Sequence, residues 1–146
     1  MSARVSPGLA FTIVCDRGFA LGLYTHKDPK MGELVWMAEG FWAEEPTLDD
    51  VAPATWAWCV FFPLAAALKR RLVFPVGKVD VPDALAEFPI MRAGGKQQGW
   101  FLVRDGVMDN FLFEKASDPS VSPRILVNDT RLKEMLVTGW TPESLW

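Results

Sequence analysis

The sequence predicts an α+β domain, a predominantly antiparallel β-sheet with a few short helices and a C-terminal helix. Short apolar runs rich in β-forming residues recur along the chain between turns that contain Gly, Pro or Asp, and this spacing favours hairpins. Half of the 146 residues are hydrophobic, among them seven Trp and ten Phe, which is enough for one core. We therefore expect a single domain over residues 1–146, with 1–8 as a candidate disordered N-terminus. Barrel-like closure of the sheet stays an open alternative.

The first part of the chain has the pattern of a β-meander. Apolar runs at 9–16, 19–26 and 33–42 each have the length and composition of a strand. Gly22 interrupts the second run, which indicates a bulge or a close approach of neighbouring groups. Gly40 is expected to kink the third run. Because short turns join these runs, neighbouring strands are expected to pair as hairpins.

The middle of the chain alternates between strand and helix patterns. Residues 58–62 are a strand candidate. A short helix is expected at 63–71, because it begins with proline, continues with alanines and ends with basic residues. The run 72–81 is strand-like, but Pro75 cannot donate a hydrogen bond to a neighbouring strand, so an edge or a bulge is expected. One or two helical turns are expected at 82–88.

A loop and a hairpin are predicted beyond residue 90. The glycine pair at 94–95 is expected to form the loop. The apolar runs 100–106 and 108–115 surround Asp105-Gly106, a dipeptide that strongly favours a tight hairpin turn.

A C-terminal helix is expected between residues 128 and 139. Asn128 or Asp129 is the candidate N-cap, and Gly139 is the expected stop. Apolar residues at helical spacing predict the face that packs on the core; they are Leu132, Met135 and Leu136.

The chain lacks the residue sets that catalysis or metal binding usually requires. Its single histidine, His26, stands next to a charged loop, where a histidine is usually solvated. Cys15 and Cys59 lie far apart in apolar runs, so we interpret them as buried free thiols and not as metal ligands. Neither a phosphate-binding glycine loop nor a nucleophile elbow occurs in the sequence. The sequence predicts a protein that is not an enzyme and that uses no cofactor and no metal.

The acidic residues are distributed unevenly. Residues 31–68 contain six acids and no Lys or Arg, and three basic residues follow at 69–71. Such a block is most often a solvated face, and otherwise it attracts a basic partner. An aromatic side chain within it is a candidate anchor. The partner-binding residues expected on this basis are Glu39, Trp42, Glu44, Glu45, Asp49 and Asp50.

Composition also limits the kinds of partner. The formal net charge of −3 argues against nucleic acid, which requires a basic face. The longest apolar run, 56–68, is too short to span a bilayer and is interrupted by Pro63. No signal peptide is recognisable. We expect a soluble, cytoplasmic protein without nucleic-acid or membrane partners, and the sequence leaves its oligomeric state unknown.

Three segments resemble the immunity protein 26 family of bacterial polymorphic toxin systems: FTIVCDRGFALGLY, RLVFPVGKVDVPDALAEFPIMRAG and GWFLVRDG. The shared features are a Gly-x-aliphatic step, an aliphatic-Gly step, a Pro-led acidic turn and an aromatic-Pro pair. Here they are Gly22-Leu23-Tyr24, Val76-Gly77, Pro82-Asp83 and Phe88-Pro89. The resemblance implies a small bacterial, cytoplasmic, mostly β domain that neutralises a cognate toxin by binding it, without catalysis. It implies no active-site residues.

Two alternatives stay open. One is a small ligand-binding or hydrolytic β-rich domain, in which Asp49 or Asp50 would act as acid or base in a Trp-lined acidic pocket. A pocket where carboxylates converge with Trp36, Trp42 or Trp58 would favour it. The other is an oligomeric structural protein, for which the hydrophobic composition leaves room.

Overall fold

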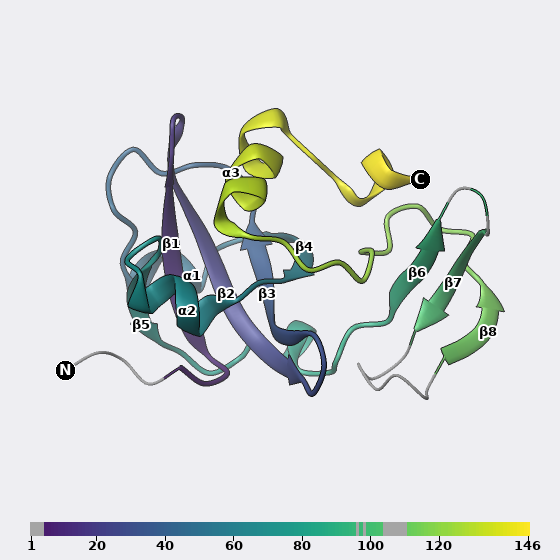
Figure 1. Cartoon of the computed structure of the whole chain (residues 1–146). Helices are drawn as coiled ribbons and strands as arrows, with labels where there is room; N and C mark the ends of the chain where they lie inside the picture. Colours follow the sequence, from purple (N-terminus) through teal and green to yellow (C-terminus); the bar gives the residue numbers. More distant parts are fainter. Residues whose placement is uncertain (1–4, 96, 98, 104–110) are drawn as a thin grey trace.

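A computed structural model describes residues 5–95, 97, 99–103 and 111–146, and places their strands in two antiparallel sheets (Figure 1). The larger sheet has five strands in the order β4-β3-β2-β1-β5, and the smaller has three in the order β6-β7-β8. The bounds are β1 Leu9–Cys15, β2 Gly18–Asp28, β3 Gly32–Ala38, β4 Trp56–Phe61, β5 Phe74–Lys78, β6 Met91–Gly95, β7 Gly99–Val103 and β8 Phe111–Lys115. The predicted α+β class with a dominant antiparallel sheet is confirmed. In the described part of the chain the sheets are open, so the barrel-like alternative is not realised.

The large sheet grows by consecutive hairpins, as the meander pattern predicts. β1 pairs with β2 from Ala10 to Cys15, and Phe11 lies opposite Gly22. A side chain at position 22 would collide with the Phe11 ring, so glycine is required there. β5 returns to the free edge of β1, and Pro75 pairs at a register shift on this edge strand. The edge position predicted for Pro75 is therefore confirmed.

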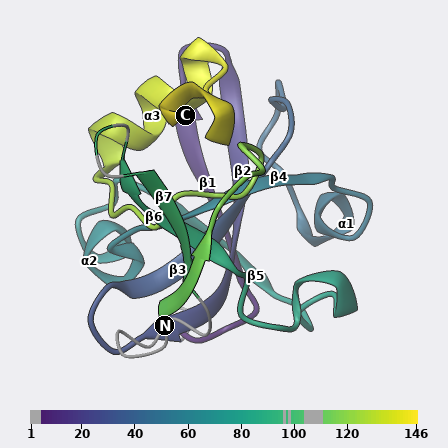
Figure 2. The ribbon, with the colours of Figure 1, turned by 90° about the vertical axis from the view of Figure 1, so that its right-hand side faces the viewer.

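Short helices cover the two faces of the large sheet. Their bounds are α1 Leu48–Val51, α2 Leu64–Lys69, η1 Asp83–Leu85, α3 Asp129–Thr138 and η2 Pro142–Leu145. Helices α2 and α3 bury Leu64, Leu132 and Met135 against Phe11 on one face. On the opposite face, α1 and η1 bury Val51 and Leu85 (Figure 2). The sheet is therefore a central layer between the two helical groups.

The caps of α3 agree with the sequence. The Asn128 side chain accepts a hydrogen bond from the Arg131 amide at 2.8 Å, so Asn128 is the N-cap. Gly139 ends the helix with a φ of 71°, in the left-handed region that glycine adopts without strain. Both ends of the predicted helix are thereby confirmed.

The prediction of a loop at 94–95 is wrong. Gly94 and Gly95 belong to β6 and pair with Trp100 and Gly99 of β7. Gly94 has a φ of 114°, and a side chain there would strike the Gly99 carbonyl. Glycine serves close strand packing at this point and does not end the strand. The hairpin turn predicted at Asp105-Gly106 lies outside the described residues.

Two arginines connect the C-terminal part of the chain to the sheets. Arg124 forms an ion pair with Asp28 at 3.3 Å, and the Asp28 side chain is fully buried. Arg92, in β6, is also fully buried. Its guanidinium donates a hydrogen bond of 2.5 Å to the Pro142 carbonyl and lies 4.3 Å from the centre of the Trp100 ring.

The N-terminal segment is held where it is described. The Gly8 amide donates to the Tyr24 carbonyl at 2.8 Å, and the Val79 amide donates to the Gly8 carbonyl at 2.9 Å. The Lys78 ammonium also donates to the Ser6 hydroxyl. None of the described helices is long and apolar enough to cross a membrane.

Candidate functional site

The six predicted partner-binding residues lie on the connection between β3 and β4, which includes α1. Glu39, Glu44, Glu45 and Asp49 are exposed, whereas Trp42 and Asp50 are half-buried. The connection is closed at its base by the Glu39 amide, which donates to the Thr55 carbonyl at 2.8 Å. The structure therefore brings the acidic residues together on one ordered segment.

Trp42 anchors this segment to the molecule. Its amide and carbonyl both bond to Phe19 in β2, each at 2.8 Å, and its side chain packs against the cluster that contains Leu21 and Val51. Part of the indole is thus committed to internal packing, and the side chain is only partly exposed.

Asp50 has a structural role. Its carboxylate accepts a hydrogen bond from the Thr47 amide at 2.8 Å, which caps the first turn of α1. Asp49, beside it, is exposed at the same helix N-terminus, where the helix dipole favours a negative charge. Glu44 and Glu45 precede the helix. They are exposed and, unlike Asp50, they do not cap the helix, so their carboxylates are free of that role.

A second group of acids, which composition did not single out, lies on the same face. Asp80, Asp83 and Glu87 are exposed around η1, and η1 packs on the same apolar cluster as α1 (Figure 2). The sequence separates the two groups by about thirty positions, and the residues between them include Lys and Arg. The fold joins them because both segments cover one face of the sheet.

His26 fixes the η1 segment and is not a free surface residue, contrary to the sequence interpretation. Its Nε2 donates to the Ala86 carbonyl at 2.9 Å, and its Nδ1 lies 3.0 Å from the Thr25 hydroxyl. The ring also lies against Phe88, with 5.1 Å between ring centres. The imidazole is therefore occupied by structural contacts.

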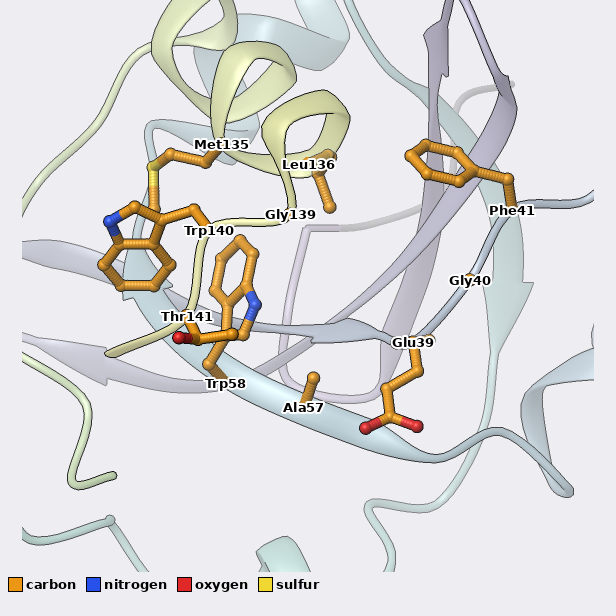
Figure 3. Close-up of a pocket in the computed structure, with 11 residues that line it drawn as sticks. Glu39, Gly40, Phe41, Ala57, Trp58, Met135, Leu136, Gly139, Trp140 and Thr141 are labelled. Atoms are coloured by element: carbon orange, nitrogen blue, oxygen red, sulfur yellow. The ribbon is translucent and has the colours of Figure 1, made fainter. Parts of the chain in front are cut away.

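A small cavity lies at the base of the β3–β4 connection, on the side of the sheet that carries α3. Its volume is about 210 Å³. The side chains that shape it include Glu39, Phe41, Trp58, Leu136 and Trp140 (Figure 3). Trp58 and Trp140 meet edge to face, with ring centres 5.0 Å apart and planes at 77°. Asp49 and Asp50 are not among the lining residues.

Sequence reasoning selected Glu39 for its charge and named Trp58 as a candidate pocket residue, but it missed Phe41, Leu136 and Trp140. Phe41 and Trp58 flank the two ends of the connection, and Trp140 follows the glycine that stops α3. An aromatic residue directly after a helix stop is a usable indication of packing near a helix end. Nothing in the sequence indicates that this helix end faces residues 39–41.

The described residues form no recognisable catalytic or metal centre. No three His, Cys, Asp or Glu side chains gather at metal-binding distance within the described ranges. Both cysteines are free, with Cys15 half-buried and Cys59 buried. The pKa of the Cys15 thiol is raised above its ordinary value, mainly by burial; nearby Lys133 opposes the rise and Asp16 adds to it.

None of the three comparisons, with protein-family models, with curated proteins and with solved structures, found a match to this chain. The resemblance to the immunity protein 26 family therefore stays a prediction from the sequence motifs.

Cys59 is expected to resist thiol reagents as long as the protein is folded. Burial raises the pKa of this thiol from 9.0 to about 12, although a hydrogen bond with Ser122 opposes the shift. The thiolate is the reactive form, so little of it exists below pH 11. Because the folded state holds this proton more tightly, the thiol's contribution to stability is complete below pH 9 and is lost as the pH rises toward 12.

The measurement is labelling with an aromatic disulfide reagent at pH 8, followed for both cysteines. Cys15 is expected to react slowly in the native state, and Cys59 at the rate of unfolding. A Cys59→Ala variant identifies the signal of each thiol. Rapid labelling of Cys59 in the native protein would contradict its burial.

Proposed function

We propose that the protein is a non-catalytic binding module that captures and neutralises a basic protein partner through its acidic face, and that this partner is a cognate bacterial toxin in the cytoplasm. The acidic face is defined here as the exposed carboxylates around α1 and η1: Glu44, Glu45, Asp49, Asp80, Asp83 and Glu87. The toxin as partner comes from the resemblance of the sequence motifs, and the acidic face comes from the fold.

The main support is that the acidic face is ordered by internal contacts. The Trp42 backbone pairs with Phe19, Asp50 caps α1, and His26 holds η1. A surface fixed before binding loses little conformational entropy in the complex. Charges of one sign on such a surface increase the rate of encounter with an oppositely charged partner.

The alternative of a sugar or nucleotide pocket has less support. The cavity of about 210 Å³ is smaller than typical ligand pockets, which hold roughly 300–1,000 Å³. It contains one carboxylate, from Glu39, so the pair of acids needed for glycoside hydrolysis does not converge there.

The test of the toxin proposal uses the C-terminal domain encoded immediately upstream of this chain's gene. That domain is expressed in a bacterial host with and without the chain, and growth is recorded. We expect the domain to arrest growth and co-expression to restore it. A harmless domain, or a toxic one that the chain neither binds nor neutralises, would overturn the proposal.

The contribution of the acidic face is tested by Glu44→Lys with Glu45→Lys in one variant. Both residues are exposed and neither caps a helix, so stability should be unchanged. The association rate with the upstream-encoded domain is expected to fall roughly tenfold at low salt, and its dependence on salt should weaken. Stopped-flow measurements at several salt concentrations provide both quantities.

The matched control is Asp16→Lys with Glu134→Lys, which changes the net charge equally on the side of the molecule that carries α3. Its association rate should stay within about twofold of the parent protein, since steering depends on where the charges lie. Equal slowing in both variants would indicate that net charge matters and the acidic face does not.

A further inference from the structure

We infer that the cavity between residues 39–41 and the end of α3 is a socket for one arginine side chain of the protein partner. This inference rests on the proposed binding function and adds a recognition element to it. The socket lies outside the acidic face. The socket lies on the α3 side of the sheet and the acidic face on the α1 and η1 side; the base of the β3–β4 connection, which also carries α1, lines the socket.

The size of the cavity selects the kind of occupant. About 210 Å³ is too little for most organic ligands, which occupy roughly 300–1,000 Å³, but it suits one long side chain. The walls are mainly apolar, with Ala57, Leu136 and the aromatic rings around an open mouth (Figure 3). Such walls accept the aliphatic stem of a long side chain while its charged end reaches a polar group.

The charges around the cavity favour a cation. Glu39 supplies a carboxylate at the rim. Helix α3 ends at Gly139, another lining residue, so the negative end of a ten-residue helix lies at the cavity. The residues that line the cavity include no Lys and no Arg, although the Arg17 guanidinium lies over the ring of Phe41, which is one of them. The negative charge of the carboxylate and the negative end of the helix both attract a cation.

Arginine fits this combination better than lysine. A guanidinium is flat, is weakly hydrated and pairs with a carboxylate through two parallel hydrogen bonds. Within this protein, Phe41 already accepts the Arg17 guanidinium over its ring, at 5.2 Å from the ring centre. In Figure 3 the indole nitrogen of Trp58 points to the side on which Glu39 lies. The Glu39 carboxylate itself points away from the rings in Figure 3, so pairing with a guanidinium in the cavity requires this side chain to turn inward.

The test uses argininamide as the probe and the Trp58 indole N–H signal in a proton–nitrogen NMR spectrum as the readout. A Trp58→Phe variant assigns that signal. We expect saturable shifts with a dissociation constant in the low millimolar range, as suits a ligand of this size. Citrullinamide, which has the same shape without the charge, is expected to cause no saturable shift. Lysinamide is expected to bind several times more weakly.

Glu39→Gln should weaken argininamide binding about three- to fivefold, the effect of removing one exposed charge partner. Glu44→Gln is the matched control, because Glu44 is exposed on the same connection but does not line the cavity. It should bind argininamide as the parent protein does. Equal shifts with citrullinamide, no saturable shift with argininamide, or equal losses in the two variants would each overturn the inference.

The outcomes separate this inference from the proposed function. If argininamide fails to bind while the chain still rescues growth from the upstream-encoded domain, the socket is refuted and the binding function stands. If argininamide binds but the domain is neither bound nor neutralised, the toxin proposal fails and the socket stands.

Discussion

Replacing Asp28 by asparagine is expected to lower the free energy of unfolding by about 3–5 kcal/mol, the usual cost of breaking a buried ion pair. Asp28 is fully buried and pairs with Arg124 at 3.3 Å. Its other carboxylate oxygen accepts from the amides of Lys30 and Met31, at 2.7 and 3.0 Å, and so shapes the β2–β3 turn. The substitution leaves the Arg124 guanidinium buried without its charge partner, and this accounts for most of the loss.

Urea unfolding monitored by circular dichroism measures this effect. The double variant Asp28→Asn with Arg124→Met should recover part of the loss, since it removes the unpaired charge as well. Glu134→Gln is the control, because Glu134 pairs with Arg131 on the exposed surface of α3, where a pair contributes about 1 kcal/mol or less. Equal losses for Asp28→Asn and Glu134→Gln would contradict the structural role of the buried pair.

Replacing Arg92 by alanine is expected to cost about 2–4 kcal/mol, and to release the C-terminal segment from the small sheet. The guanidinium donates to the carbonyls of Pro142 and Pro119, at 2.5 and 3.4 Å. It also lies near the rings of Trp100 and Trp146, at 4.3 and 5.2 Å from their centres. Burial lowers the pKa of Arg92, and the nearby Glu143 carboxylate partly offsets this. No carboxylate pairs with it directly in the described part of the chain.

Hydrogen exchange with mass spectrometry shows where this loss occurs. Arg92→Ala should accelerate exchange in residues 140–146 and in β7, with little change in β1 and β2. Arg92→Lys keeps the charge but lacks the planar fork, so it should give most of the same acceleration. Protection that is unchanged in 140–146 would show that Arg92 does not hold this segment.

Several features of the fold could be predicted because their causes are local. The α3 boundaries follow from Asn128 and Gly139, whose side-chain and backbone preferences act within one helical turn. The edge position of β5 follows from Pro75, which lacks an amide hydrogen. The error at Gly94 has the opposite origin. Glycine is needed there because a side chain would strike the carbonyl of Gly99 across the hairpin, and this contact cannot be read from the composition of the segment.

In the candidate site, too, the features with local causes could be predicted and those that depend on distant neighbours could not. The base-free acidic stretch was visible in the sequence, because charge is a property of each residue. The sequence did not indicate that Asp50 would cap α1 or that Trp42 would pack into the core, since both depend on neighbours. It also did not indicate that the η1 acids would join those of α1 on one face.

The sequence by itself determined the class of fold, most element positions, the acidic character of the β3–β4 connection and the lack of catalytic motifs. These follow from residue chemistry and from patterns that repeat over a few positions. The tertiary structure alone decided that Glu39 meets the end of α3 at a cavity, that Arg92 holds the C-terminus, and that two acidic segments share a face. Those pairings join residues about 35 to 100 positions apart, and only the packing of the whole chain against the sheet brings such residues into contact.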